Sequence, residues 1–398
     1  MANVTQLKHL EHLEDEMLNY GVEGCKSAVS FLKELKNMLG HQESSGFMQT
    51  KWDGAPSLIC GTNPMNDMFF VGTKSVFAKT EPKMCYTHED VDAYYQGDLA
   101  IKLKTSLDYF SGLNIQGVVQ GDLLYTETDL KTETIDGERL YTFRPNTITY
   151  AIPTDHPIGK AAKRAKIGVV FHTHYTGTYV PDMQAAAGAD INGNADVLVI
   201  KNDTPMHKVG FSRAEMSKFD SYIRKIERMC QICGPFLDEL VAVGGKTGDA
   251  KFHISSFLKQ FFNSEIKNAR TISNVNEAMY DMLNFYEEKT SKELAKIKTV
   301  ANLTKKRSLV YDSQNYVVDN VYKFKAMLAL YKELQSVKQM VIDKLDHLEE
   351  FRTFVQTEKG YKVTTPEGYV LHKDGSMIKF VNRLEFAYNN FTLQKQWR

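Results

Sequence analysis

The feature that most restricts the fold of this sequence is a change of texture that reverses near its end. From about residue 47 to 199, short β-branched and aromatic runs alternate with Gly, Pro and Asn, which indicates a sheet. From 212 to about 355 the pattern is long, charged and helical. Strand patterning returns at 369–371 and 377–381, around an Asp-Gly pair that is a strong hairpin signal. A sheet segment that reappears after a long helical stretch indicates an α+β fold with a helical module inserted into a sheet domain.

The expected organisation follows from these changes of pattern. Apolar residues recur at helical spacing between Gln6 and Leu39, with a break near Gly21, which predicts two short helices at the start. Further helices are expected at 217–233, 253–262, 276–303 and 317–354. The predicted segments are N-terminal helices at 1–45, the first part of the sheet domain at 46–211, a helical insertion at 212–355, and the last strands with a C-terminal tail at 356–398.

Composition excludes several classes of protein. Lysine plus arginine and aspartate plus glutamate both number 49, so a polyanion site must be a local patch rather than a property of the whole surface. Five scattered cysteines favour a reducing, intracellular setting over a disulfide framework. The N-terminal residues lack the apolar core of a signal peptide, and no run approaches the roughly 20 apolar residues that span a bilayer. We expect a cytoplasmic protein without a membrane partner.

Several polar groups are candidate binding positions. Cys230 and Cys233 could be half of a zinc site, and His172 and His174 alternate onto one face of a strand, where they could bind a metal. For each pair we favour ordinary structural positions, because the sequence offers no second cysteine pair and no third ligand near the histidines. Two basic clusters are candidate phosphate contacts or solvated basic faces: Lys160, Lys163, Arg164 and Lys166, and Lys305-Lys306-Arg307.

The segment most informative about chemistry is Lys51-Trp52-Asp53-Gly54, between strand-like residues 47–49 and 58–60. An unperturbed lysine has a pKa near roughly 10.4, so a nucleophilic lysine needs desolvation or cationic neighbours to lose its proton. A turn with a solvated surface lysine is the alternative.

These residues resemble the covalent nucleotidyltransferase superfamily of ATP-dependent DNA ligases, RNA ligases and mRNA-capping guanylyltransferases, whose nucleophile motif is Lys-Xaa-Asp-Gly. Similar motifs follow in the family's order: Gly72-Thr73-Lys74-Ser75, Val118 to Tyr125 with Gly121-Asp122, Val169-Val170-Phe171-His172, Glu367-Gly368-Tyr369-Val370 and Met377-Ile378-Lys379-Phe380. The same set, with the tail to Arg383, also looks like that of uncharacterised proteins of large tailed phages. That likeness suggests a bacteriophage protein in the host cytoplasm.

The resemblance implies a fold and a role for each matched residue. The fold would be a nucleotidyltransferase (ATP-grasp-like ligase) antiparallel-sheet domain. Lys51 would attack the α-phosphate of ATP, Glu367 would bind Mg²⁺ or Mn²⁺ and help deprotonate Lys51, and Lys379 would neutralise charge on the phosphorus oxygens. Lys379 and the metal would also lower the pKa of Lys51. The implied nucleotide-binding set is Asp53, Gly54, Lys74, Asp122, which would contact ribose, and Phe171, which would stack on the base.

Two points stay open within this resemblance. Pro56 stands where many ligases carry Arg, Asp122 replaces a glutamate, and Met377 stands where a lysine is common, so catalytic competence is in question. The strand-like run Asp196 to Lys201 also has a carboxylate at one end and a lysine at the other, and competes with Glu367 as the source of the metal-site carboxylate.

The last two motifs make a geometric prediction. A two-residue turn at Asp374-Gly375 would pair residue 370 with 379 and place Glu367 and Lys379 on opposite faces unless a bulge intervenes. A three-residue loop with Gly375 left-handed would pair 369 with 379 and place both on one face. A shared site therefore predicts the three-residue loop.

The resulting hypothesis is an ATP-dependent polynucleotide ligase. Only 19 residues follow Lys379, too few for the five-stranded barrel that DNA ligases and capping enzymes place there, so RNA is the expected substrate rather than DNA. DNA ligase and capping-type guanylyltransferase are alternatives. Two further hypotheses belong to other functional classes. One is an inactive nucleotide-binding protein, and the other is a phage structural or interaction protein with a chance motif match. Nothing in the sequence indicates the oligomeric state.

Overall fold

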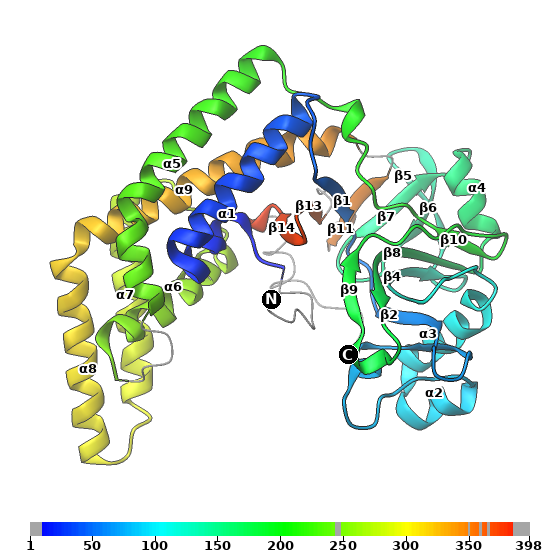
Figure 1. The fold of residues 1–398 in the computed structure, drawn as a ribbon, viewed down its shortest axis with the longest axis horizontal. Coiled ribbons are helices and arrows are strands. Elements are labelled where there is room, and N and C mark those ends of the chain that lie inside the picture. The colour runs from blue at the N-terminus through cyan, green and yellow to red at the C-terminus, as the bar shows by residue number, and fades with distance from the viewer. Residues whose placement is uncertain (1–9, 243–247, 349–350, 358–359, 364–366, 385–398) are drawn as a thin grey trace.

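The computed structural model describes residues 10–242, 248–348, 351–357, 360–363 and 367–384 of the chain. Figure 1 shows two halves side by side, with long helices on the left and β-sheets on the right. The mixed α+β class is therefore confirmed. No helix among the described residues is both long and apolar enough to cross a bilayer.

The described strands form three sheets. The largest has the order β10-β8-β4-β2-β3, with β9 paired to β8, and comprises Val197–Val199, Ile167–Thr176, Val118–Thr126, Ser57–Thr62, Phe69–Gly72 and Gln184–Ala187. A second has the order β12-β11-β7-β6-β5, from Gly360–Val363, Arg352–Thr357, Thr149–Pro153, Glu138–Phe143 and Lys131–Ile135. The third has the order β1-β13-β14, from Phe47–Lys51, Gly368–Lys373 and Ser376–Phe380. All pairings are antiparallel except that of β10 with β8.

Short helices accompany the sheets. The α-helices are α2 (His88–Tyr94), α3 (Gly97–Phe110) and α4 (Pro157–Arg164), none of which was expected within the strand-rich region. The 3-10 turns are η1 (Leu13–Asp15), η2 (Lys74–Phe77), η3 (Val180–Asp182), η4 (Met206–Lys208) and η5 (Asp346–Leu348). Helix α3 covers one face of the largest sheet, where Leu103 and Phe110 join a core with Val119, Leu123 and Phe171.

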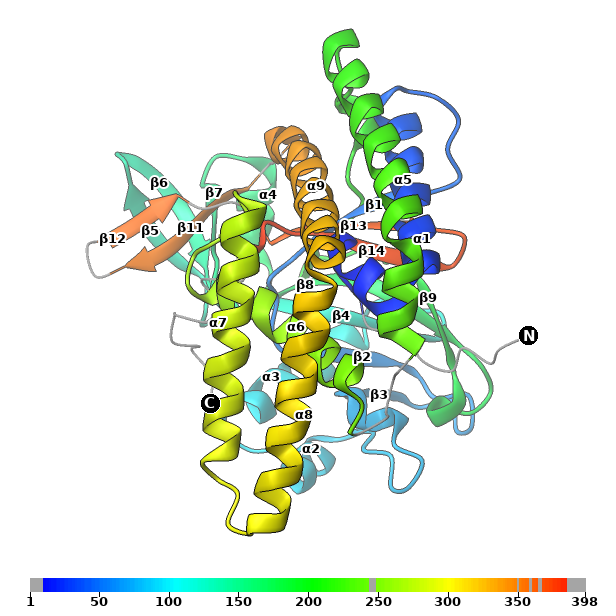
Figure 2. The ribbon, with the colours of Figure 1, turned by 90° about the vertical axis from the view of Figure 1, so that its left-hand side faces the viewer.

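The helical half contains α5 (Arg213–Ala242), α6 (Ala250–Lys267), α7 (Val275–Leu294), α8 (Val300–Asp319) and α9 (Val321–Leu345). The expected helices at 276–303 and 317–354 are wrong in extent, because the chain turns between α7 and α8 and because β11 begins at Arg352. The two expected N-terminal helices are joined as α1 (Glu16–Leu39), kinked at Gly21 with φ 58°. Helix α1 packs along α5, so it belongs to the helical half (Figure 2).

The three-stranded sheet joins the two halves of the molecule. Its two faces differ in chemistry. Side chains alternate between faces along each strand. One face is apolar and belongs to the core shared with α1, α5 and α9: Met48, Tyr369, Leu371, Ile378 and Phe380. The register places the following residues on the other face: Phe47, Gln49, Lys51, Val370, His372 and Lys379. The helical half therefore supports one face of a sheet whose other face carries both predicted lysines.

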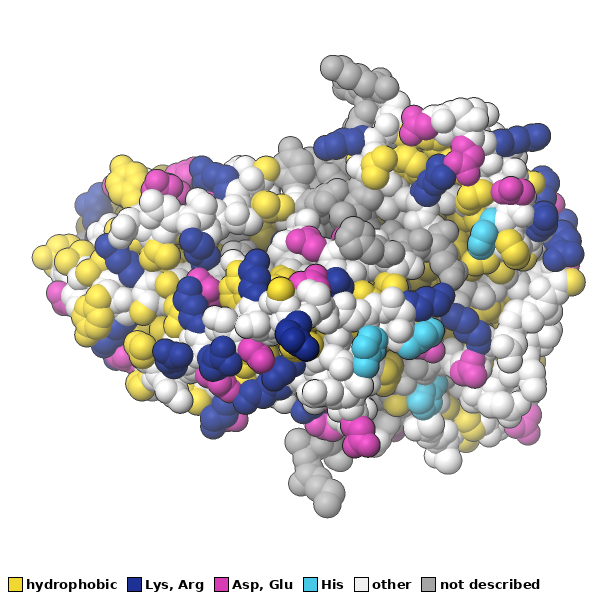
Figure 3. Space-filling view, turned by 90° about the horizontal axis from the view of Figure 1, so that it is seen from above, with side chains coloured by type: hydrophobic (Ala, Val, Ile, Leu, Met, Phe, Trp, Pro, Cys, Tyr) yellow, Lys and Arg dark blue, Asp and Glu magenta, His cyan; other side chains and the backbone are white. Residues whose placement is uncertain are grey.

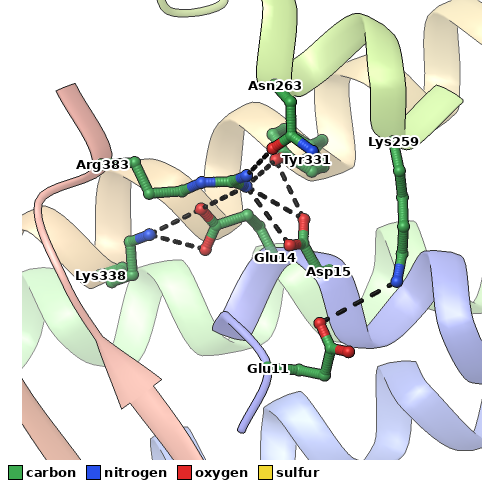
Figure 4. A network of polar contacts seen from close by, with 8 residues as sticks. All are labelled: Glu11, Glu14, Asp15, Lys259, Asn263, Tyr331, Lys338 and Arg383. Carbon is green, nitrogen blue, oxygen red and sulfur yellow. Dashed lines mark hydrogen bonds and ion pairs between the residues drawn. The ribbon is translucent and has the colours of Figure 1, made fainter. Parts of the chain in front are cut away.

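A buried ionic network fastens the end of this sheet to the helical half (Figure 4). Lys338 on α9 donates to both carboxylate oxygens of the fully buried Glu14, at 2.6 and 2.8 Å. Arg383, just after β14, donates to Asp15 at 3.1 Å and to Tyr331 at 2.8 Å. Burial alone would raise the pKa of Glu14, but the charges of Lys338 and Arg383 hold it below its ordinary value.

Candidate active site

The hairpin that carries the last two motifs has a two-residue turn. Asp374 and Gly375 both have positive φ, 50° and 72°, as a type I′ turn requires. Val370 pairs with Lys379, and Lys373 pairs with Ser376. The predicted three-residue loop is therefore wrong. The Asp-Gly pair forms the tight turn that this dipeptide favours locally.

Glu367 and Lys379 nevertheless reach one site, because the strand geometry is irregular at Gly368. Gly368 lies opposite Lys51 in the register and has φ 132°, outside the range of a regular strand. A Cβ at this position would collide with the carbonyl oxygen of Phe380. Strict alternation therefore ends at Gly368, and the carboxylate of Glu367 accepts a hydrogen bond from the Lys51 ammonium in an ion pair. The assumption that failed was regular strand geometry at Gly368.

Replacing Gly368 by alanine should both destabilise the fold and separate the pair. The positive φ disfavours any L side chain, and the Cβ would displace the adjacent backbone of β14. We expect a loss of about 2 kcal/mol in the free energy of unfolding, measured by urea denaturation. Gly375→Asn is the matched control, because it also lies at positive φ but has no atom within 4 Å of a new Cβ. Equal losses in both variants would show that Gly368 has no special packing role.

Lys51 lies in a largely desolvated, acidic environment. Its side chain is 30% exposed and that of Glu367 is 10% exposed. Burial acts to lower the pKa of Lys51, but the carboxylate of Glu367, followed by Asp122 and Asp53, raises it above the ordinary value. The protein residues alone thus do not produce the lowered pKa that the resemblance implied. Burial raises the pKa of Glu367 to about 7, so this carboxyl group exchanges its proton near neutral pH.

Changing Glu367 to glutamine should lower the pKa of Lys51. The substitution removes the largest influence that raises it, and leaves burial and the cation of Lys379 to act in the other direction. At a fixed mildly alkaline pH, Lys51 should therefore react faster with a small amine-directed acylating reagent than in the parent protein. Peptide mass spectrometry would measure the rate at Lys51, with exposed Lys305 as an internal reference. A slower reaction of Lys51 in the variant would contradict this account.

Asp122 faces Lys51 from the largest sheet, beside His172. A β-bulge in β8 at His172 interrupts the register between Gln120 and Gly121, and such bulges re-aim side chains. The His172 ring nitrogen Nε2 lies 3.6 Å from the Asp122 carboxylate. Burial opposes ionisation of Asp122, but His172 and then Lys51 hold its pKa below the ordinary value. Asp122 is therefore a carboxylate that contacts His172 and whose charge acts on the Lys51 amine.

Asp53 and Gly54 shape the turn that presents Lys51. The buried Asp53 carboxylate accepts hydrogen bonds from the backbone N–H groups of Thr147 and Ile148, at 2.8 and 2.9 Å, and from the Asn146 amide. These bonds anchor the turn to the loop before β7 and occupy the carboxylate that was expected to bind nucleotide. A Cβ at Gly54 would lie 2.6 Å from the Asp122 Cβ, so glycine permits the close approach of the turn to β4.

Lys379 lies on the same sheet face as Lys51 and faces other cations. Its backbone N–H donates to the carbonyl of Glu11 at 3.0 Å, and His12 bridges it in parallel. Burial, then the charges of Lys51 and Arg383, lower the pKa of Lys379. Burial, followed by the charges of Lys338 and Arg383, holds the pKa of His12 well below its ordinary value. A cluster of cations that repel one another is a favourable environment for a bound anion.

Two predicted nucleotide-binding residues lie apart from this group. Lys74 is exposed at the start of η2, beyond the edge strand β3, and no hydrogen bond or ion pair joins it to Lys51 among the described residues. Phe171 pairs with Gly121, on the face opposite Asp122, and its ring packs on Phe110 at a centroid distance of 5.6 Å. The geometry does not support a stacking role for Phe171.

The bulge also separates the two histidines of β8. His174 pairs with Val119 on the core face, whereas His172 contacts Asp122 on the other face. The expected common face is therefore wrong. Sequence reasoning missed both His172 as a neighbour of Asp122 and His372, whose pKa is lowered to about 4 by burial and by His172. The alternation of side chains along β8 could have predicted that His172 lies next to Asp122 only if the bulge had been known.

The competing carboxylate, Asp196, does not meet Lys51. Its backbone carbonyl accepts hydrogen bonds from Lys166 and Ile167 at the start of β8, and its side chain is exposed. Lys201 donates to Asp190 and to the carbonyl of Ile191. The observed partner of Lys51 is Glu367, which favours the later motif.

A cavity of about 380 Å³ opens beside Lys51, a size typical of small-molecule sites. Its walls combine aromatic and basic side chains, among them Trp52, Tyr150, Phe351, Lys201 and Lys208. The indole N–H of Trp52 is buried and has no hydrogen-bond partner among the described residues. A buried donor without a partner is costly, so this wall suits a ligand with an acceptor atom.

Two carboxylates near Lys51 could hold a magnesium ion that is shared with phosphate. No group of three or more His, Cys, Asp and Glu side chains within the described ranges could hold a metal. Mg²⁺ typically takes one or two carboxylates, with substrate phosphates and water as its remaining ligands. Glu367 and Asp122 supply two carboxylates that both interact with Lys51. Cys230 and Cys233 are free cysteines on α5, and they belong to no potential metal-binding group among the described residues.

Comparison with known proteins places the chain in a family. A model described as a family of unknown function (DUF6267) matches residues 3–395, so the chain belongs to this family. No curated protein matches it. Among solved structures there is likewise no match.

Proposed function

We propose that this member of a family of unknown function is a covalent nucleotidyltransferase, and specifically an ATP-dependent RNA ligase that works through a lysyl-AMP intermediate on Lys51. The observation that carries the proposal is the ion pair of Lys51 with Glu367, residues 316 positions apart in the sequence. Asp122 and Lys379, from two other motifs, interact with the same amine. A chance match of short motifs would not bring four of them to one amine.

The proposed first step transfers AMP from ATP to the lysine. The neutral Lys51 amine attacks the α-phosphorus, a phosphorus–nitrogen bond forms, and the bond to the β-phosphate oxygen breaks, so that pyrophosphate leaves. The amine must first lose a proton. Glu367, with a pKa of about 7 and a direct hydrogen bond to Lys51, is the acceptor best matched to neutral pH.

The other residues act on charge and position. Lys379 compensates the negative charge that grows on the α-phosphate oxygens, and its position on the Lys51 face allows this contact. A bound Mg²⁺ or Mn²⁺ would supply Lewis-acid stabilisation of the phosphates. Asp122, with His172 Nε2 at 3.6 Å from its carboxylate, would contact the ribose of the nucleotide.

The test is direct labelling of the protein. Incubation with α-labelled ATP and Mg²⁺ should leave acid-labile, alkali-resistant radioactivity on the chain, because a phosphoramide forms. γ-Labelled ATP is the matched control and should leave none, because pyrophosphate departs. Labelling by GTP and not ATP would move the assignment to a capping-type guanylyltransferase. Absence of label with every nucleotide and metal would favour an inactive nucleotide-binding protein or a phage structural protein.

The nucleic-acid substrate requires a second assay. Single-stranded RNA ends, nicked RNA and nicked DNA should be offered to the labelled protein, with release of AMP and sealing of the strand as the readouts. We expect the fastest sealing with RNA. Faster sealing of nicked DNA would replace RNA ligase by DNA ligase and leave the covalent step in place.

A further inference from the structure

The turn between α7 and α8 carries a concentrated positive charge in a chain that has none overall. Between residues 289 and 307 there are seven basic residues and one acidic residue, Glu293. Six of the basic side chains are exposed, and we call these six the basic tip: Lys289, Lys292, Lys296, Lys298, Lys305 and Arg307. The seventh, Lys306, is partly buried and pairs with Glu293 at 2.7 Å. The sequence pattern Lys305-Lys306-Arg307 is thus only part of a larger patch that the helical turn assembles.

Most of this charge is not neutralised within the protein. Lys292 pairs with Glu288 one turn away, and Lys289 lies over the Phe285 ring. No ion pair among the described residues involves Lys296, Lys298, Lys305 or Arg307. Four exposed cations so close together repel one another, which is a cost that a bound polyanion would remove.

The basic tip also projects from the molecule. In Figures 1 and 2, α7 and α8 run side by side and their connecting turn lies at the end farthest from α5 and α9. Elsewhere on the helical half, basic and acidic side chains are interspersed, as Figure 3 shows from above. On α5, for example, the exposed Arg213, Lys218, Arg224 and Arg228 alternate with Glu215, Asp220 and Glu227. The basic tip is therefore distinct from the ordinary mixed surface.

An exposed aromatic side chain adjoins the cations. Tyr311 is 65% exposed and lies one helical turn after Arg307, on the same face of α8. Cations that track phosphates, together with an aromatic ring that can stack on a base, are the recurring elements of single-strand binding. We propose that the basic tip, with Tyr311, binds single-stranded nucleic acid. The assignment of this strand as the substrate to be joined rests on the proposed function.

The chemistry favours nucleic acid over an anionic membrane. A helix that binds at a lipid surface buries Trp, Phe or Leu side chains below the headgroups. Between residues 289 and 307 there is no Trp or Phe, and Leu294 and Leu303 are both partly covered. The exposed large apolar side chain of this stretch is Val300, at 79%. One valine among six exposed cations is a small apolar anchor, and the patch suits a flexible polyphosphate chain better than a lipid surface.

The test compares two charge-reversed variants of the full chain. The tip variant carries Lys296→Glu, Lys298→Glu, Lys305→Glu and Arg307→Glu. The matched control carries Arg213→Glu, Lys218→Glu, Arg224→Glu and Arg228→Glu on α5, with the same change in net charge. Fluorescence anisotropy measures the affinity for an unstructured, labelled oligouridylate of about 20 nucleotides and for the corresponding DNA. Circular dichroism checks that both variants are folded. If either is not, both are replaced by variants in which the same four residues are changed to glutamine.

The tip variant should bind the oligonucleotide at least about tenfold more weakly than the control variant, because four phosphate contacts are lost. The dependence of log affinity on log salt should become shallower by about 3 units in the tip variant, at roughly 0.7 unit for each contact. Tyr311→Ala should weaken binding without changing that slope. Equal losses in both charge variants, or binding of the parent protein to phosphatidylserine vesicles but not to the oligonucleotide, would overturn the proposal. ATP labelling of Lys51 should persist in the tip variant, which separates this test from that of the proposed function.

Discussion

Replacing Lys51 by alanine should abolish covalent labelling by α-labelled ATP. The substitution removes the only amine that the proposed step modifies, while Asp122 and the cavity walls stay in place. We expect a loss of roughly four orders of magnitude or more, as is typical when the nucleophile of a covalent enzyme is removed. Scintillation counting of the gel-purified proteins would measure the loss of label. In the parent protein, mass spectrometry should find AMP on the peptide that contains residue 51.

Two variants make this result specific. Lys51→Arg preserves the positive charge beside Glu367 but offers no amine of suitable pKa, so it should remain unlabelled. Lys201→Ala removes another lysine that lines the same cavity, and should retain labelling within about tenfold because Lys201 is held by Asp190. Full labelling of Lys51→Ala would show that another residue accepts the nucleotide and would remove the basis of the proposed function.

The second large effect concerns stability. Glu14→Ala should lower the free energy of unfolding by about 3 to 5 kcal/mol, because it leaves the buried Lys338 ammonium without its bidentate partner. Arg383 lies 3.5 Å from Glu14 and would lose a partner as well. Urea denaturation followed by circular dichroism would measure the change. Because Arg383 lies three residues after the end of β14, loss of the network should also loosen the position of Lys379.

The control for this effect is a solvent-exposed ion pair on the protein surface. Glu23→Ala removes the partner of Lys26, but their side chains are 76% and 68% exposed, and we expect no measurable change in stability. Replacing both Glu14 and Lys338 by methionine should restore much of the stability, because no unpaired charge then stays buried. A Glu14→Ala variant as stable as the Glu23→Ala variant would contradict the view that Glu14 is an essential counterion.

Much of the fold follows from local sequence patterns. The strand at 118–126 and the helices α5 and α6 were expected from periodicity, and the structure contains them. The insertion of helices before the last hairpin was also expected. By contrast, α3 was missed because its mixed apolar and polar residues lie within a strand-rich region. The break between α7 and α8 was missed because no proline or glycine marks residues 295–299.

Some residues of the candidate site were also predicted correctly, and others were not. The family resemblance implied Lys51, Glu367, Lys379 and Asp122, and the charges of the other three residues act on or respond to that of Lys51. It proposed Phe171 as a base-stacking residue, and the register places that ring in a core on the opposite face. Phe171 pairs with Gly121 rather than with Asp122, and a shift of one residue along a strand reverses the face of a side chain.

By itself, the sequence determined the α+β class, the motif order and a hairpin at Asp374-Gly375, because periodicity and turn chemistry act over a few residues. The length of that turn was predicted wrongly, because the prediction assumed regular strands on either side of it. Only the tertiary structure decided which side chains share a face. That depends on the positive φ of Gly368 and on the bulge at His172, and each of these irregularities is set by packing against distant strands. The pairing of Lys51 with Glu367 has the same origin, since a contact across 316 positions exists only once the sheet that joins the two halves has formed.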